Sequence, residues 1–377
     1  MAMAMFKSMA FNMPVASWLR RPRTHAIGLE LSLNRLNLAQ FKSQPPGGLP
    51  ILQAACSLPY PSDRDTLLAS PQSLKALLAS AFKQYPFRGR RVTTLLPADK
   101  VRTLSLSYPL KPGQDETDII LTTLAQRLNE RLEDLIIDYI PIRTTDDRPE
   151  RLVLIAMARR SEVIDYLELL RRAGLDVASV EIGQTAISRL ILWLNGHVPD
   201  RNSLVINFGN DNSYLTMIAG RRLVIDHSID FGEATLLKRL ASELDISGLQ
   251  ARALMRSADT DGQSEQWTSA QPCNDNARTL ALDILLPDLI QLKDEIRRTL
   301  IYAASELHGQ PVHNLYLFGS LARWNGLREH LQGLIEIPAQ YPDPLGAFQG
   351  ERWHTSDGQQ DFCIATGLAL KELTPHA

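Results

Sequence analysis

The sequence predicts a mixed α/β fold. Three observations carry this prediction: short strand-like runs open each half of the chain, each opening run ends in a turn and continues into a hairpin, and amphipathic helical segments separate the later strands. The opening runs lie at 27–35 and 205–212. A third strand followed by a turn, at 316–320, precedes a helix.

The composition is that of a globular protein long enough to bury a sizeable core. The chain has 377 residues, 44% hydrophobic and 22% charged, which argues against disordered and fibrous classes. Its 40 Lys and Arg and 42 Asp and Glu give a formal net charge of −2, so charge gives no reason to expect nucleic acid as a partner. The 3 cysteines include no CxxC pair, which predicts neither a disulfide framework nor a zinc site and favours a reducing compartment.

The first 24 residues differ in character from the rest. Apolar residues such as Met5, Phe6 and Trp18 come before Arg20 and Arg21, whereas a signal peptide carries its positive charges first. Two interpretations stay open: a tail without a role, or a short amphipathic segment on an anionic membrane surface. No stretch of eighteen or more residues is continuously apolar, so we expect no transmembrane helix.

The elements of the first half follow from periodicity and turn signals. Ser70 and Pro71 are typical of a helix start, with Leu74, Leu77 and Leu78 on one face. Strands are expected at 25–32, 36–41, 92–96, 101–106, 135–140, 151–157 and 177–182, and helices at 71–82, 115–131 and 163–170. The run from the strand at 101–106 to the strand at 177–182 predicts a compact subdomain inserted into a larger sheet.

The second half repeats the opening of the first. Strands are expected at 203–209, 213–218, 222–228 and 312–319, and helices at 233–244, 287–304, 326–334 and 363–373. Residues 256–278 are polar and almost unpatterned, which predicts a long surface loop. Turns at strand ends are where α/β proteins hold phosphates, because backbone N–H groups approach the anion there. Taken alone, each turn is a weak signal, and the residues at 207–210 are then more typical of an ordinary β-turn.

Six blocks in order resemble a known family. They are IGLELSLNRLNLAQ, RVTTLLPADKVRTLSLSYP, SLVINFGNDNSYLTMIAGRRLVIDHSIDFGE, DEIRRTLIYAAS, LYLFGSLARWNGLREHLQGLIEIPAQYPDPL and ATGLALKEL, and they run from Ile27 to Leu373. The chain resembles the type IV pilus assembly protein PilM family, which is actin-like and related to the cell-division protein FtsA. The resemblance implies an actin-like (ribonuclease-H-like) two-lobed fold with a small inserted α+β subdomain. The expected divisions are a tail at 1–24, the first lobe at 25–98, the subdomain at 99–182, the second lobe at 183–360, and a C-terminal helix at 361–377 that returns to the first lobe.

The resemblance also implies where a nucleotide would bind. The matching positions are Glu30, Ser32, Asn34, Asn207, Gly209, Asn210, Asn212, Gly232, Arg297, Arg298, Gly319 and Ser320. Several depart from the family pattern: Asn207 replaces an aspartate that holds Mg²⁺ through water, and Glu233 is expected to bring a carboxylate near an anionic ligand. Binding of ATP with Mg²⁺ and loss of that binding both stay open, and hydrolysis is expected to be weak or absent.

Two classes of function remain. The first is a scaffold in the cytoplasm, peripheral at the inner membrane, which binds the cytoplasmic N-terminal peptide of a PilN-like protein and contacts the pilus assembly motor. Its peptide groove would lie between the first lobe and the inserted subdomain, near 101–106, and would add the peptide to a sheet edge. The alternative is an active actin-like ATPase or sugar-kinase-like enzyme. No GxSxG, HExxH or P-loop motif occurs, so no catalytic residue or metal ligand is assigned. Trp324, beside the third turn, fits either a protein contact or a structural cap. Self-association stays open.

Overall fold

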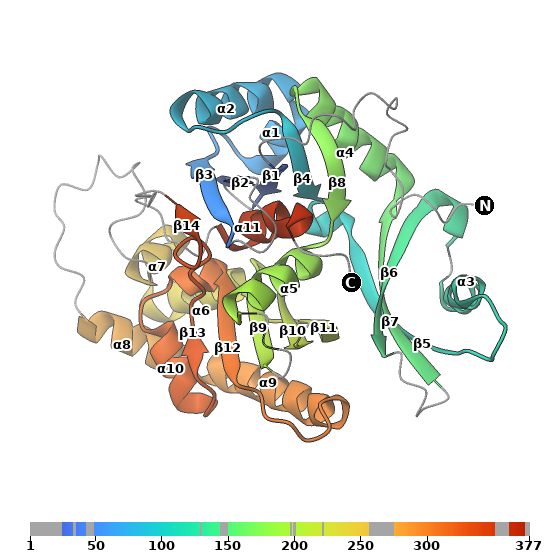
Figure 1. The fold of residues 1–377 in the computed structure, drawn as a ribbon. Coiled ribbons are helices and arrows are strands. Elements are labelled where there is room, and N and C mark those ends of the chain that lie inside the picture. Colours follow the sequence, from blue (N-terminus) through green and yellow to red (C-terminus); the bar gives the residue numbers. More distant parts are fainter. Residues whose placement is uncertain are drawn as a thin grey trace. The chain divides into compact units, whose positions relative to one another are not determined.

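The computed structural model describes residues 25–373 except 33–34, 43–48, 129, 144–149, 197, 199–200, 221, 256–274 and 351–361. Its chain forms two compact units (Figure 1). The first contains the described residues of Met1–Leu190, Leu345–Trp353 and Ile364–Ala377, and the second those of Ile191–Pro344 and His354–Cys363. The predicted tail at 1–24 and most of the predicted loop at 256–278 lie outside the described residues.

A six-stranded sheet forms the centre of the first unit. Its order is β14-β3-β2-β1-β4-β8, with β1–β3 antiparallel and β4 and β8 parallel to β1. The strands are β1 (Ile27–Leu31), β2 (Arg35–Lys42), β3 (Ile51–Pro59), β4 (Arg91–Leu95), β8 (Asp176–Glu181) and β14 (Gln349–Gly350). The strand β3 was not predicted, because its sequence ILQAACSLP is almost wholly buried and shows no alternation.

Helices cover this sheet on both faces. Alternate residues of β1, Ile27, Leu29 and Leu31, pack with α1 (Arg64–Ala69), α2 (Pro71–Gln84) and α4 (Arg160–Arg172). The predicted start of α2 is confirmed, because the Ser70 hydroxyl accepts a hydrogen bond from the Ser73 N–H at 3.2 Å. Gly28 points to the other face, where α11 (Cys363–Ala369) packs directly on the strand.

A separate three-stranded antiparallel sheet belongs to the same unit. Its order is β5-β7-β6, formed by β5 (Arg102–Pro109), β6 (Leu135–Arg143) and β7 (Glu150–Arg159). The helix α3 (Glu116–Arg127) covers one face, with Ile120 and Leu124 in a small core with Leu106 and Val153.

The inserted subdomain is therefore shorter than the predicted 99–182. The helix α4 and strand β8 belong to the larger sheet, because Tyr166 and Leu170 of α4 are buried with the core of β1 and β2, and β8 pairs with β4. A strand–helix–strand–strand–helix run does not show at which strand the chain returns to the larger sheet.

The second unit repeats the sheet order of the first. Its order is β11-β10-β9-β12-β13, with β9–β11 antiparallel and β12 and β13 parallel to β9, which matches β3-β2-β1-β4-β8. The strands are β9 (Asn202–Phe208), β10 (Ser213–Ala219), β11 (Arg222–Ile229), β12 (Asn314–Gly319) and β13 (Ala339–Gln340). The helices are α6 (Glu233–Leu244), α7 (Gly248–Met255), α8 (Asp275–Ile284), α9 (Leu286–Glu306) and α10 (Leu327–Leu334).

The boundaries of the units correct the predicted division at 183–360. The helix α5 (Gly183–Leu194) begins in the first unit, where Gly367 of α11 lies against the backbone of Ala186. Residues 345–350 also return there, since β14 pairs with β3. Among the described residues no helix combines the length and the hydropathy needed to cross a bilayer.

Candidate functional site

Seven predicted nucleotide residues gather at the carboxyl ends of β9 and β12 in the second unit. They are Asn207, Gly209, Asn210, Asn212, Gly232, Gly319 and Ser320. The two strands are parallel neighbours, with Gly319 paired to Phe208. The Ser320 hydroxyl donates to the carbonyl oxygen of Gly209 at 3.1 Å, which ties the two strand ends together. The sequence order of the turns therefore predicted a real cluster.

The glycines in this cluster serve contacts between loops. A Cβ on Gly209 would lie 2.2 Å from the Asn212 carbonyl oxygen, and one on Gly232 would lie 2.3 Å from that of Asn210. Gly319 has a φ of 84°, and a Cβ on it would lie 2.1 Å from the Phe208 carbonyl oxygen. Each of these three glycines therefore allows a close approach of two stretches of backbone that a side chain would prevent.

The first amides of α6 are also engaged. The N–H of Glu233 donates to the Gly209 carbonyl at 3.1 Å, and that of Ala234 donates to the Asn210 carbonyl at 2.8 Å. These are the amides that a helix start offers to an anion. The expectation that Glu233 faces a ligand is wrong: its side chain is buried in the second unit and accepts a hydrogen bond from the indole of Trp324.

In the first unit the predicted residues belong to an internal polar network. The Asn37 amide donates to the Glu30 carboxylate at 3.1 Å and its oxygen accepts from Ser57 at 2.6 Å. Ser57 in turn accepts from the buried Arg35 guanidinium at 2.7 Å. The Ser32 hydroxyl donates to the Arg35 carbonyl at 2.9 Å, and Asn34 lies outside the described residues. Sequence reasoning missed Arg35 and Ser57, because their partners lie on separate strands.

The two predicted arginines lie on the exposed side of α9. Arg297 and Arg298 are both exposed, and Arg298 forms an ion pair of 3.0 Å with Glu295 one turn earlier. The helix packs on the sheet through the opposite side, where Ile296 and Thr299 are buried. Arg298 thus belongs to a solvated helix face.

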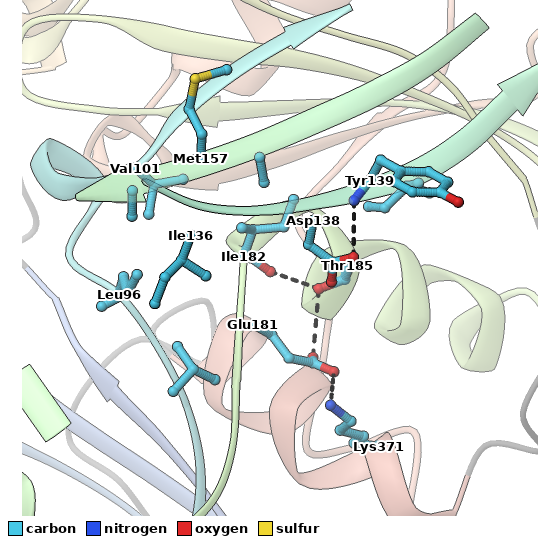
Figure 2. Close-up of a pocket in the computed structure, with 14 residues that line it drawn as sticks. Leu96, Val101, Ile136, Asp138, Tyr139, Met157, Glu181, Ile182, Thr185 and Lys371 are labelled. Carbon is cyan, nitrogen blue, oxygen red and sulfur yellow. Dashed lines mark hydrogen bonds and ion pairs between the residues drawn. The ribbon is translucent and has the colours of Figure 1, made fainter. Parts of the chain in front are cut away.

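A pocket in the first unit is a second candidate site, and we call it the β6–β8 pocket. It lies between the three-stranded sheet and the end of β8 (Figure 2). Its lining residues are Leu96, Val101, Ile136, Asp138, Tyr139, Ile140, Ala156, Met157, Ala158, Val180, Glu181, Ile182, Thr185 and Lys371. The lining is mostly aliphatic, with the polar groups gathered at one end (Figure 2).

Two small residues of β7 help to make the hollow. Ala156 is paired with Asp138 across the β6–β7 ladder, and Ala158 with Ile136. These four residues share the sheet face opposite α3, because side chains alternate along a strand. A large side chain at Ala156 would fill the space. In the sequence LVLIAMA only Ala156 and Ala158 are small, and two alanines in a strand do not by themselves indicate a hollow.

The polar end of the pocket is a three-residue charge cluster. The Glu181 carboxylate pairs with Arg189 at 2.9 Å and with Lys371 at 2.7 Å, and accepts from the Thr185 hydroxyl at 3.5 Å. Burial would raise the pKa of Glu181, but the two cations outweigh it and hold that pKa below its usual value. The cluster joins β8, α5 and the 3₁₀ turn Leu370–Glu372, so it fixes the chain's C-terminal turn at the pocket.

The strand β6 borders the pocket as a sheet edge. Among the described strands it pairs only with β7. Of the predicted groove segment 101–106, Val101 lines the pocket, whereas Leu106 packs under α3.

The repeated sheet order in two units of one chain, with a small inserted subdomain, defines an actin-like protein. The family model of the type IV pilus assembly protein PilM matches residues 28–373, and the chain belongs to this family. A solved PilM–PilN type IV pilus biogenesis complex superposes with a TM-score of 0.72 at 22% identity, over 94% of this chain and 100% of that chain. The ethanolamine utilization protein EutJ from Carboxydothermus hydrogenoformans superposes with a TM-score of 0.52 at 12% identity, over 93% of this chain and 90% of that chain. A comparison with curated protein sequences gave no significant match.

Proposed function

We propose that the chain is a scaffold of a type IV pilus or related assembly complex, and that the β6–β8 pocket binds the cytoplasmic N-terminal segment of a PilN-like inner-membrane protein. The observation that carries the proposal is the pocket itself, an apolar hollow bordered by the strand edge β6. The similar PilM–PilN complex supports the choice of partner. Such a partner holds the chain at the cytoplasmic face of the inner membrane.

The geometry suits an extended peptide. A segment added to β6 forms main-chain hydrogen bonds, and every second side chain then lies on the pocket face of the sheet, beside Ile136, Asp138 and Ile140 at the edge of the hollow. Ile136, Ile140 and Val180 offer aliphatic contacts to those side chains. Backbone pairing supplies affinity, and the shape of the hollow selects the side chains.

ATP hydrolysis has no part in this function. Asn207 lacks the charge that would hold Mg²⁺ through water, and the α6 amides already bind loop carbonyls. The Glu30 carboxylate accepts from Asn37 inside the first unit. Mg²⁺-dependent phosphate release by the purified chain would instead favour the alternative, an active actin-like ATPase.

Calorimetric titration with a synthetic peptide of the partner's cytoplasmic N-terminus tests the pocket. Ala156→Leu is expected to weaken binding by at least about tenfold, because roughly 1.4 kcal/mol or more is lost when the hollow is filled. Ala125→Leu, the same change on the exposed surface of α3, is the matched control and is expected to bind within about twofold of the parent chain. Equal binding by both variants would refute the pocket as the peptide site, provided that thermal denaturation shows both to be folded.

A further inference from the structure

The point where the N-terminal segment enters the described structure lies beside the β6–β8 pocket. The Ala26 N–H donates to the Glu372 carboxylate at 3.1 Å, and the His25 imidazole lies 3.3 Å from the same oxygen. Glu372 directly follows Lys371, which lines the pocket and pairs with Glu181. The 24 residues that precede His25 are therefore attached next to the polar end of the pocket.

Residues 9–15 of that segment, MAFNMPV, have the sequence of an amphipathic strand. Large apolar side chains occupy every odd position, Met9, Phe11, Met13 and Val15, and the even positions are Ala10, Asn12 and Pro14. This period of two fits a strand with one apolar face, whereas a helix on a membrane needs a period near 3.6. Pro14 would also interrupt such a helix.

The position of the proline agrees with addition to a sheet edge. In a strand, residues whose side chains share a face also direct their N–H groups to the same side. If the odd side chains enter the pocket and the odd amides face β6, the missing N–H of Pro14 faces away from β6, where no bond is needed. The proline then also prevents a further strand from pairing outside it.

The connection gives the segment a reach of several strand widths. Nine residues, 16–24, separate the segment from His25, and extended chain spans up to ~3.3 Å per residue, or ~30 Å in all. Residues 9–15 carry no charge and so match the aliphatic lining, while Arg20, Arg21 and Arg23 lie in the connection.

We propose that residues 9–15 of the chain's own N-terminal segment bind along β6 in the β6–β8 pocket and compete there with the partner peptide. The competition rests on the function proposed above. A tethered segment acts at an effective concentration of ~1 mM, so an intrinsic dissociation constant of ~0.1–0.5 mM weakens partner binding by about 3- to 10-fold.

Hydrogen–deuterium exchange of the chain with residues 1–377 tests the contact without the partner. The double variant F11D/M13D places two charges on the odd face, and A10D/N12D places the same two charges on the even face as a matched control. The amides of β6 between Ile136 and Ile140 that face away from β7 are expected to exchange about 3- to 10-fold faster in F11D/M13D than in A10D/N12D, because pairing with the segment protects them. Unchanged exchange in F11D/M13D, or an equal rise in both variants, would overturn the proposal.

Titration with the partner peptide then tests the competition. F11D/M13D is expected to bind the peptide about 3- to 10-fold more tightly than the parent chain, and A10D/N12D like the parent. If no form binds the peptide while β6 exchange still responds to F11D/M13D, the partner assignment fails and the contact stands. The last measurement is sedimentation with anionic phosphatidylglycerol vesicles. If the parent chain sediments with the vesicles, both variants lose this binding equally, and exchange at β6 does not change, then the segment binds lipid and the proposal that it lies in the pocket is rejected.

Discussion

The indole N–H of Trp324 donates a hydrogen bond of 3.1 Å to the carboxylate of Glu233, and each side chain is only 1% exposed. Glu233 begins α6, at the position where the family resemblance predicted a carboxylate near a bound nucleotide. Here the acid points into the core of the second unit, with Arg252 at 3.8 Å from its other oxygen. Trp324 is therefore a structural residue that holds this acid, and the interpretation as a protein contact is not supported.

Replacing Trp324 by Phe removes the donor and leaves the carboxylate short of one hydrogen bond. A bond to a charged group is worth about 2 kcal/mol, so Trp324→Phe is expected to lower the free energy of unfolding by at least that amount. Urea denaturation measures it. In a double-mutant cycle with Glu233→Gln, the two changes should be non-additive, and additive losses would contradict a direct interaction.

Mg²⁺-ATP is expected to stabilise the chain very little. The amides of Glu233 and Ala234 already donate to loop carbonyls, and Asn207 offers no negative charge to the metal. With a dissociation constant of ~1 mM or weaker, 1 mM Mg²⁺-ATP adds about 0.4 kcal/mol, or a rise of roughly 1 °C in Tm. Differential scanning fluorimetry checks this, with Mg²⁺ alone as the control. A rise of several degrees would show that the loops still hold a nucleotide.

Much of the fold could be predicted because many of its strands and helices have clear start, end and periodicity signals in the local sequence. Ser70 with Pro71 fixes the start of α2, and Gly319 marks the end of β12. The predictions that failed concerned elements without a clear local signal or with partners far along the chain. The buried strand β3 shows no alternation, and α8 begins at Asp275, within a segment predicted as loop. Only pairing with β4 reveals that β8 belongs to the larger sheet.

The candidate sites divide in the same way. The turn residues Gly209 and Gly319 were predicted together from their order in the family pattern, and the structure brings them together. The direction in which Glu233 points could not be predicted, since it depends on Trp324, 91 residues away. The pocket is lined by residues from separate elements, such as Ala156 and Lys371, and no local pattern in the sequence shows that these elements come together.

Close packing of α11 on β1 predicts a large difference between two glycines. A Cβ on Gly28 would lie 1.9 Å from the Ala365 carbonyl oxygen, so Gly28→Ala must displace α11 and is expected to cost about 1–3 kcal/mol. Gly333 of α10 is exposed with open space around it, and Gly333→Ala is expected to stabilise by up to about 1 kcal/mol. Urea denaturation of both variants provides the comparison, and equal stabilities would argue against direct contact between α11 and β1.

The charge cluster at the pocket predicts a pH-dependent contribution to stability. Arg189 and Lys371 hold the pKa of the buried Glu181 below its usual 4.5 despite its burial. A carboxyl whose pKa is lower in the folded state contributes stability that is complete above pH ~4.5 and is lost as the pH falls through the folded-state pKa. Glu181→Gln leaves two cations without their acid and is expected to cost about 3 kcal/mol at pH 7.

The difference between Glu181→Gln and the parent chain should shrink as the pH falls below 4.5, because the carboxyl of the unfolded parent chain then binds a proton that the folded chain does not yet bind. Urea denaturation of both proteins at pH 7, 5 and 3 measures this difference in unfolding free energy. Glu168→Gln is the control: hydrogen bonds from Arg171 and Arg172 lower the pKa of Glu168 to about 2, but this pair is exposed, and solvent screens it. The loss of unfolding free energy in Glu168→Gln should be too small to resolve. A Glu181→Gln difference that stays the same from pH 7 to pH 3 would show that the glutamine disturbs packing, and that the two cations do not account for the effect.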